Sequence, residues 1–198
     1  MLNNKFLKVT KMVIASLSGD DKKVYPVDGI NSVKTAPTYQ EVKIEGNGDV
    51  QEDYLKIMNY SLTAKMNNFP HELAAQVLGM TKMANGVLKQ EGKKMSNFYV
   101  AYRIETTEGI GVYFIFMNCS SFKVSDLGVT NPASNATSVS GTDKELHCTA
   151  NKDANGVICY IASEEDVNIT ADIFDTVPTE ETLSQLTKVT GTTKVEKV

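Results

Sequence analysis

The amino-acid sequence predicts a mainly β fold, an antiparallel β-sandwich or β-barrel with one flanking α-helix and long polar loops. Apolar and polar residues alternate with a period of two in several segments of the 198-residue chain, which is typical of strands with one buried face. Residues 112–117 are apolar at both parities, so we expect a central strand that is covered on both faces. Asn-Gly pairs at 47–48, 85–86 and 155–156 indicate hairpin turns between strands.

The periodic segments define the predicted elements, and the strands are expected at 6–17, 30–36, 41–45, 61–67, 98–105, 112–117, 138–150 and 156–162. A helix is predicted over about 69–79, because Pro70 presets a first helical turn and Gly79 is a natural C-cap. A second helix is expected to begin near Pro178 and to run through Leu186. Residues 18–40 and 126–142 show no clear pattern, and we expect them to form long exposed loops.

The charge distribution divides the chain into a β domain at residues 1–165 and an acidic C-terminal extension at 166–198, partly helical and partly flexible. Residues 143–198 contain eleven acidic and five basic side chains, and we interpret this acidic run as a solvated surface. Arg103 is the only arginine among 20 basic residues, so the chain has almost no guanidinium groups that could bind bases or phosphates through two hydrogen bonds. This composition argues against sequence-specific DNA binding.

The cysteines and the hydropathy pattern predict a protein that is neither stabilised by disulfides nor inserted in a membrane. Cys119, Cys148 and Cys159 are an odd number without a compact disulfide framework, so we expect them to be reduced, half-buried thiols. Nothing at the N-terminus resembles the apolar core of a secretory signal. The longest apolar run, residues 112–117, is far too short for a membrane helix, and we therefore expect no membrane association.

No catalytic constellation is recognisable, and we expect neither an enzyme nor a bound cofactor. Nucleophilic catalysis needs a Ser or Cys beside an oriented base, and the two candidate bases are His71 and His147. His71 opens the predicted helix, where we expect it to cap the helix or to face solvent. His147 precedes Cys148, but neighbours in a strand point to opposite faces and cannot form a local dyad. The paired carboxylates Glu164 and Glu165 lie in the acidic run without an accompanying pocket signal.

Metal and phosphate sites are not expected either. The three cysteines and His147 lack the close spacing that structural zinc favours. Residues 151–162 imitate the first half of an EF-hand loop, but Ala162 stands where the bidentate carboxylate should be, so we expect a hairpin turn there. The glycine pairs at 46–48 and 109–111 lack the third glycine and the following helix of a dinucleotide-binding loop.

The order of elements nevertheless resembles a known family. A strand with the sequence YSLTAKM at 60–66 precedes FPHELAAQVLG at 69–79, and a strand pair at 98–105 and 111–117 closes on NCSSFKV at 118–124. A Thr/Ser-rich segment then leads into KELHCTA at 144–150, the Asn-Gly turn and a last strand at 157–160. This pattern resembles the major tail tube proteins of long, non-contractile-tailed (siphovirus-type) bacteriophages. The resemblance covers roughly residues 1–165 and is most specific over 55–125.

The resemblance implies a structural virion protein that self-assembles into stacked hexameric rings, the tail tube through which DNA is ejected. It implies contacts with copies of itself, a tape measure protein, and tail terminator and distal tail proteins, with assembly in the host cytoplasm. DNA would pass through without sequence-specific binding. We expect residues 18–40 and 126–142 to contact other subunits, and edge strands to pair across subunits. Alternatives are a secretion-system tube protein of the same general fold, a β-sandwich surface binding module, and an enzyme that depends on His147.

Overall fold

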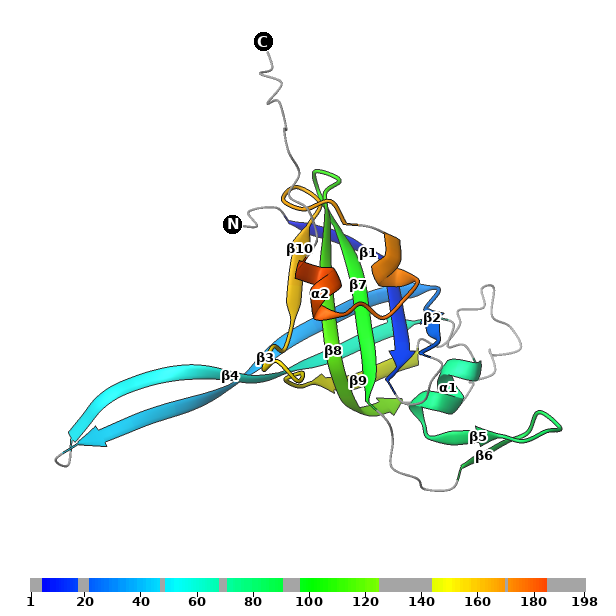
Figure 1. Ribbon diagram of the computed structural model, residues 1–198, viewed down its shortest axis with the longest axis horizontal. Helices are drawn as coiled ribbons and strands as arrows, with labels where there is room; N and C mark the ends of the chain where they lie inside the picture. Colours follow the sequence, from blue (N-terminus) through cyan, green and yellow to red (C-terminus); the bar gives the residue numbers. More distant parts are fainter. Residues whose placement is uncertain are drawn as a thin grey trace, which may run out of the picture.

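The computed structural model describes residues 5–17, 22–46, 49–67, 71–90, 97–124, 144–169 and 171–184 (Figure 1). Its first half contains β1 (Phe6–Ser16), β2 (Val24–Pro26), β3 (Ile30–Gly46), β4 (Asp49–Met66), α1 (His71–Val77), β5 (Met80–Lys82) and β6 (Leu88–Gln90). Its second half contains β7 (Phe98–Thr106), β8 (Gly111–Val124), β9 (Lys144–Ala150), β10 (Tyr160–Ser163), the 3₁₀-helix η1 (Ala171–Phe174) and α2 (Glu180–Ser184).

One large antiparallel sheet forms the body of the molecule. Its strands lie in the order β2-β1-β7-β8-β9-β4-β3, and β10 joins by pairing with β8. The strands β7 and β3 are four places apart in this order, yet the hydroxyl of Tyr102 on β7 lies 2.5 Å from the hydroxyl of Thr35 on β3. This contact shows that the sheet curls strongly. The mainly β, antiparallel fold predicted from the sequence is confirmed, with most strands in one curled sheet and β5 and β6 in a separate two-stranded sheet.

Apolar side chains fill both faces of the central strands. Successive residues of a strand face opposite sides, so Met12 of β1 joins the cluster inside the curl while Val13 joins a second cluster on the outer face. On β8, Phe116 belongs to the inner cluster and Ile115 to the outer one, and each is at most 1 % exposed. The predicted two-sided covering of residues 112–117 is therefore confirmed.

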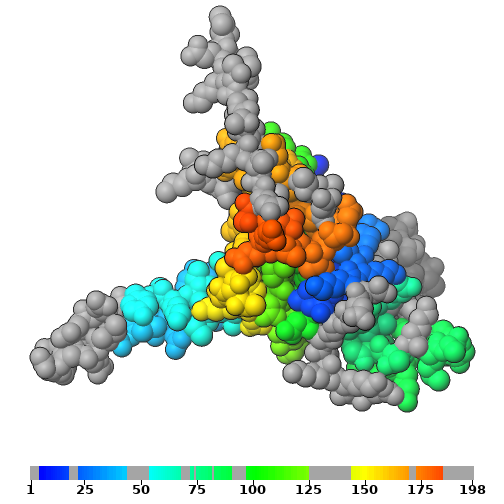
Figure 2. Space-filling view, in the orientation of Figure 1, coloured from blue at the N-terminus to red at the C-terminus, as the bar shows by residue number. Residues whose placement is uncertain are grey.

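The outer cluster is closed by the chain after β10. Ile173 and Phe174 of η1 are buried against β1, β7 and β8, and the hydroxyl of Tyr99 donates a 2.7 Å hydrogen bond to the carbonyl of Ile173. The ring of Phe174 lies 5.6 Å from that of Tyr113, between ring centroids. Figures 1 and 2 show this segment, drawn in orange, lying across the central strands. Residues 171–184 thus form a covering layer on the sheet.

The two predicted helices are both present. The first is α1, and Gly79 ends it in a left-handed conformation (φ 66°), with its N–H donating to the carbonyl of Gln76 at 3.1 Å. The second is α2, whose N-cap is Thr179, because its hydroxyl accepts the N–H of Thr182 at 3.1 Å. The last two residues of the predicted second helix, 185 and 186, lie outside the described residues.

The expected long loop at 18–40 is wrong for most of its length. β2 and the first eleven residues of β3 occupy this range, and the predicted strands 30–36 and 41–45 are parts of one continuous β3. The sequence did not predict this strand because β3 ends the sheet and faces solvent along much of its length, so its residues lack the alternation of apolar and polar types that marks a half-buried strand. Pro37 is tolerated there, since an edge strand does not need every backbone N–H. The second expected loop, 126–142, lies outside the described residues.

The turns around the Asn-Gly pairs differ from one another. Asn85-Gly86 joins β5 to β6 as predicted, with Gly86 at φ 85°. The predicted pair at 47–48 lies between the paired residues Gly46 and Asp49, but is itself outside the described part of the chain. Gly156 does form a turn (φ 80°), yet the predicted hairpin is wrong, because β9 and β10 both pair with β8 and not with each other. The strand predicted at 156–162 is limited to β10, and the one at 138–150 is described only as β9.

Candidate assembly surfaces

A long hairpin projects from the body of the sheet (Figure 1). β3 and β4 pair along their whole length, whereas β9 pairs with residues 60–66 of β4 and leaves the rest of that strand uncovered. Residues 39–46 and 49–58 therefore pair with each other alone within the described part of the chain, and we call them the arm. The sequence did not predict the arm, because strand alternation marks each strand without indicating how far a hairpin extends beyond the sheet.

The arm holds apolar side chains in solvent. Leu55 is 67 % exposed, Tyr39 is 55 % exposed and Tyr54 is 49 % exposed. The cross-strand register places Tyr39 and Leu55 on one face of the arm and Tyr54 on the other. A two-stranded hairpin is marginally stable by itself in water, and exposed apolar surface of this kind marks an interaction site. The arm is therefore a candidate interaction surface, on which a partner could bury exposed apolar side chains on both faces.

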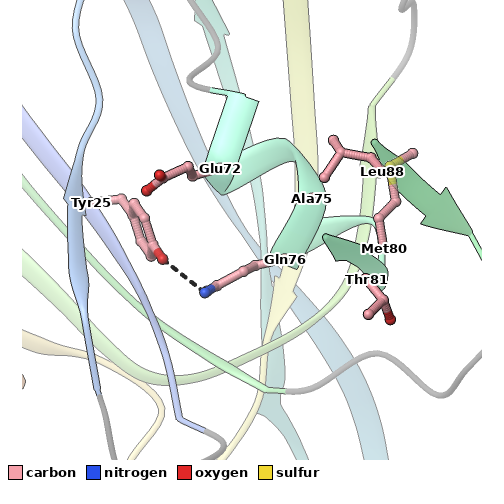
Figure 3. A pocket seen from close by; sticks show the side chains of 7 residues that line it. All are labelled: Tyr25, Glu72, Ala75, Gln76, Met80, Thr81 and Leu88. Atoms are coloured by element: carbon pink, nitrogen blue, oxygen red, sulfur yellow. Dashed lines mark hydrogen bonds between the residues drawn. The ribbon is translucent and has the colours of Figure 1, made fainter. Parts of the chain in front are cut away.

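A second projecting feature lies at the opposite end of the molecule, where α1 and the β5–β6 hairpin enclose a cavity of about 350 Å³ (Figures 1 and 3). The Gln76 side chain donates from Nε2 to the hydroxyl of Tyr25 at 2.7 Å. Its Oε1 atom is buried and has no hydrogen-bond partner among the described residues. The wall of the cavity is formed by Tyr25, Glu72, Ala75, Gln76, Met80, Thr81 and Leu88.

Strand edges form a third surface. Among the described strands, β2 and β3 end the sheet and β10 pairs with β8 alone, so each leaves one edge open. Ile161 of β10 is 54 % exposed next to such an edge. Open edges present unpaired N–H and C=O groups to which another strand can add.

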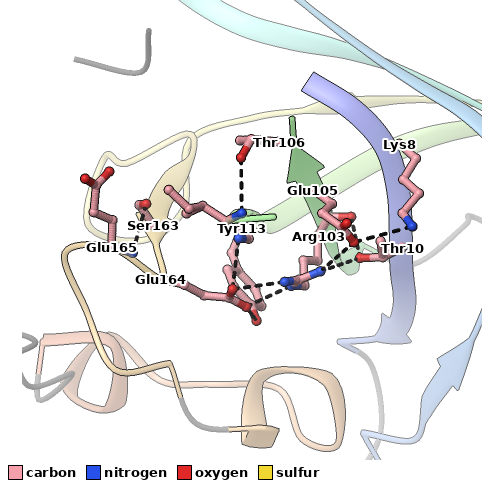
Figure 4. Close-up of polar contacts among 11 residues, drawn as sticks. Lys8, Thr10, Arg103, Glu105, Thr106, Tyr113, Ser163, Glu164 and Glu165 are labelled. Atoms are coloured by element: carbon pink, nitrogen blue, oxygen red, sulfur yellow. Dashed lines mark hydrogen bonds and ion pairs between the residues drawn. The ribbon is translucent and has the colours of Figure 1, made fainter. Parts of the chain in front are cut away.

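The single arginine is fully engaged within the subunit (Figure 4). Arg103 on β7 binds Glu164 through two parallel contacts, Nε to Oε1 at 2.8 Å and Nη2 to Oε2 at 2.9 Å. Glu164 also accepts the hydroxyl of Tyr113 at 2.6 Å and the backbone N–H of Gly111 at 2.8 Å. Hydrogen bonding to Arg103, more than any other contact, lowers the pKa of the Glu164 carboxyl to about 2, and the same pairing raises the pKa of Arg103.

This ion pair depends on the absence of a side chain at residue 111. A Cβ atom on Gly111 would lie 2.4 Å from both Nε of Arg103 and Cδ of Glu164. The interpretation of the whole acidic run as a solvated surface is therefore wrong for Glu164. One signal was available in the sequence: a lone arginine that follows five mostly apolar residues of a strand needs a carboxylate partner when it is partly buried.

The residues considered for catalysis do not converge. Cys148 points into the inner core, while His147 lies on the opposite face of β9, within 3.0 Å of the Thr63 hydroxyl and 3.3 Å of a Glu145 carboxylate oxygen. The cysteines are free, but Cys119 and Cys148 are buried rather than half-buried, and burial raises the pKa of Cys119. The side chain of His71 is outside the described part of the structure.

The segment that imitates an EF-hand loop is a closed turn. Asp153 accepts the backbone N–H groups of Asn155 and Val157, each at 2.9 Å, through Oδ1. Its Oδ2 accepts the hydroxyl of Tyr160 at 3.0 Å. These hydrogen bonds use the carboxylate to hold the turn, so the turn part of the prediction is confirmed although the flanking strands do not pair as a hairpin. Within the described ranges, no three side chains of the metal-binding types gather into a group that could hold an ion.

Residues 11–177 match the family model described as phage tail tube protein, which covers β1 through η1. The chain belongs to this family. The resemblance inferred from the order of elements is thereby confirmed. A tail tube protein is a structural component of the phage tail and not an enzyme, so the surfaces described above are candidate assembly surfaces and not reaction centres. A search of the curated proteins finds no match to this chain. None of the helices described for this tail tube protein has the length and apolar character needed to cross a membrane.

Proposed function

We propose that this tail tube protein self-assembles into hexameric rings that stack into a hollow tube, and that DNA passes through the tube during ejection. The observation that carries the proposal is the arm, which keeps Leu55 and Tyr54 in solvent at a distance from the body of the subunit. A monomer gains nothing from such a hairpin, whereas an adjoining ring can bury it. The arm thus takes the role that the sequence analysis gave to the supposed loop at 18–40, while 126–142 remains a further candidate contact.

The positions of the arm and the β5–β6 hairpin support an assembly to which further subunits can be added. The arm and the β5–β6 hairpin lie at opposite ends of the longest axis of the molecule (Figure 1). Contacts between different surfaces of successive copies are heterologous, and such contacts form closed rings or open stacks. The open edges of β2, β3 and β10 offer a second kind of contact, strand pairing between subunits of one ring.

The electrostatics suit a conduit. A channel for DNA should not bind the phosphate backbone tightly, and this chain has a formal net charge of −4 with a single arginine. That arginine is occupied by Glu164. Further partners of the proposed tube are a tape measure protein inside it and terminator and distal tail proteins at its ends, with assembly in the host cytoplasm. Residues 1–165 would form the tube domain, with 166–198 as its extension.

The proposal is tested by shortening the arm. Gln40 and Lys56 face each other in the register, so an Asn-Gly turn replacing residues 41–55 should close the hairpin without shifting any pair nearer the body. We expect the shortened protein to retain its circular dichroism spectrum and to stay small in sedimentation, while the natural protein forms tubes visible by negative-stain electron microscopy. Full-length tubes from the shortened protein would overturn the role of the arm.

A matched control keeps the arm at its full length. The double change Glu41→Gln and Lys43→Gln removes an exposed ion pair of 3.1 Å without altering the net charge or the apolar residues. Exposed ion pairs contribute little, so this control should polymerise normally. A strictly monomeric natural protein at every concentration would contradict the proposed function itself.

A further inference from the structure

We propose that the β5–β6 hairpin of one subunit docks in a groove beside α2 of a second copy of this chain. The inference rests on the proposed self-assembly and adds a contact that does not involve the arm. It draws on three observations: an apolar groove with an acidic rim beside α2, an apolar and basic face on the β5–β6 hairpin, and the separation of these two surfaces within one subunit.

The groove consists of two hollows that border α2, and Tyr160 lines both of them. Their volumes are about 320 Å³ and about 180 Å³, and we call them together the α2 groove. Met117 and Ile115 of β8 contribute apolar side chains to the larger and the smaller hollow. From α2 itself, Glu180 lines the larger hollow and Leu183 the smaller one. No residue of α2 is buried, so this short helix leaves the groove open to a partner.

The rim of the α2 groove is acidic. Asp153 and Glu180 line the larger hollow, and residues 153–184 contain eight acidic and no basic side chains. Burial, together with the hydrogen bond to Asp153 and the charge of Glu180, raises the pKa of Tyr160 to about 12. A segment that fits this groove should therefore combine apolar side chains with a positive charge.

The β5–β6 hairpin exposes a face of this kind. The N–H of Met83 donates to the carbonyl of Val87 at 2.8 Å, so these two residues lie opposite each other and share one face. Met83 is 47 % exposed and Val87 is 53 % exposed. Lys89 pairs with Thr81 and falls on the same face as Val87, two residues further along β6. Leu88 falls on the other face and lines the cavity beside α1, so the face with Met83, Val87 and Lys89 remains for a partner.

Charge distinguishes the β5–β6 hairpin from the arm as the occupant. Residues 80–90, which form the hairpin, include two lysines and no acidic residue. Residues 39–58, which contain the arm, include five acidic and two basic side chains. The arm would therefore bring like charges to the α2 groove, whereas the hairpin brings opposite ones.

The two surfaces meet only between subunits. The β5–β6 hairpin lies at one end of the longest axis of the molecule, whereas α2 and β10 lie on the body (Figure 1). A subunit therefore cannot place its own hairpin in its own α2 groove. Each copy would offer one hairpin and one groove, and such a heterologous contact can repeat from subunit to subunit.

Reciprocal charge reversal tests the contact in the full-length chain. Lys89→Glu brings a negative charge to the acidic rim, and Glu180→Lys brings a positive charge to the lysine of the hairpin. We expect each variant alone to raise the critical concentration for polymerisation by about tenfold or more at low ionic strength, because like charges then meet. An equimolar mixture should polymerise near the natural critical concentration, because alternating copies restore opposite charges at every contact.

A matched control makes the same change of charge elsewhere in the acidic run. Glu165 is exposed and does not line the α2 groove. Glu165→Lys should polymerise as the natural protein does. It should not restore polymerisation of Lys89→Glu in a mixture, because its groove keeps the acidic rim. Lys89 and Glu180 are exposed as well, so circular dichroism should show that all three variants remain folded.

A second pair of variants tests the apolar part of the contact without changing charge. Val87→Thr replaces a methyl group by a hydroxyl and keeps the branched shape. We expect the critical concentration to rise about three- to fivefold, the equivalent of losing one buried methyl group. Val87→Ile keeps the apolar character and should not raise the critical concentration. Equal values for Val87→Thr and the natural protein would overturn the docking.

The outcomes separate this inference from the proposed function. Failure of each charge variant alone, with recovery in the mixture of Lys89→Glu and Glu180→Lys, would support the docking. Normal polymers from either variant alone, or a mixture that fails to recover, would overturn the docking and leave self-assembly standing. A natural protein that never associates would overturn both.

Discussion

Replacing Glu164 with Gln should expose how strongly the ion pair with Arg103 holds the structure together. The ordinary pKa of this carboxyl is 4.5, and the fold lowers the pKa to about 2, a difference equivalent to about 3 kcal/mol at 1.36 kcal/mol per pKa unit. The Glu164 side chain is 35 % exposed, so solvent screening reduces its contribution, and we expect Glu164→Gln to lower the free energy of unfolding by about 2 kcal/mol at pH 7.

The pH dependence gives this prediction its sign. Because the pKa of Glu164 is lower in the folded state than in the unfolded state, its contribution is complete above about pH 4.5 and disappears as the pH falls toward 2. The difference in unfolding free energy between the natural protein and Glu164→Gln should therefore shrink over that interval. Urea titrations followed by tyrosine fluorescence and circular dichroism are suitable, since the chain has no tryptophan.

The neighbouring carboxylate is the matched control. Glu165 is exposed, and Glu165→Gln should change the unfolding free energy by less than about 0.5 kcal/mol. A difference for Glu164→Gln that stays constant from pH 7 to pH 3, or that is no larger than the control, would refute the assignment of Glu164 as the partner of Arg103.

Three further predictions concern the body of the subunit. Gly111→Ala should destabilise the fold by about 1–3 kcal/mol, because its Cβ displaces the Arg103–Glu164 pair, and full additivity with Glu164→Gln in urea titrations would contradict this. Phe174→Ala should cost about 3–5 kcal/mol and speed proteolysis of the C-terminal segment, whereas an unchanged proteolytic rate would show that this layer is not packed. Cys159 is half-buried and burial raises its pKa to about 12, so it should react with a thiol reagent at pH 8 more slowly in the native than in the unfolded protein, and equal rates in the two states would contradict its partial burial.

The body of the fold was predictable because its signals are local. The two-sided apolar run at 112–117 identified the central strand, and Pro70 with Gly79 bracketed the first helix. The Asn85-Gly86 pair identified the β5–β6 turn. Val112, Ile115 and Phe116 satisfy the first of these signals through burial, and Gly79 and Gly86 satisfy theirs through a positive φ angle.

The candidate site was predictable only in kind. The family resemblance pointed to assembly surfaces, yet the residues assigned to them at 18–40 were expected to form a loop. An edge strand with one wet face and a proline lacks the alternation that burial imposes, so β3 was recognised only in pieces. The partner of Arg103 lies 61 positions away in the chain, and no periodic pattern connects β7 with Glu164.

Turn geometry was likewise insufficient to define strand pairing at the C-terminal end. Gly156 forms the predicted turn, but whether the flanking strands pair with each other depends on where β8 offers a free edge. β8 is long enough to pair with β9 over one part of its length and with β10 over another. This arrangement is a property of the whole sheet and is not encoded in the turn.

Cryo-electron microscopy of polymers grown from the purified natural protein tests the central claim most directly. We predict a hollow tube of stacked rings with sixfold rotational symmetry, in which residues 39–58 of each subunit are buried against subunits of the adjoining ring. A protein that remains monomeric at high concentration, or a polymer in which these residues stay free in solvent, would contradict the account.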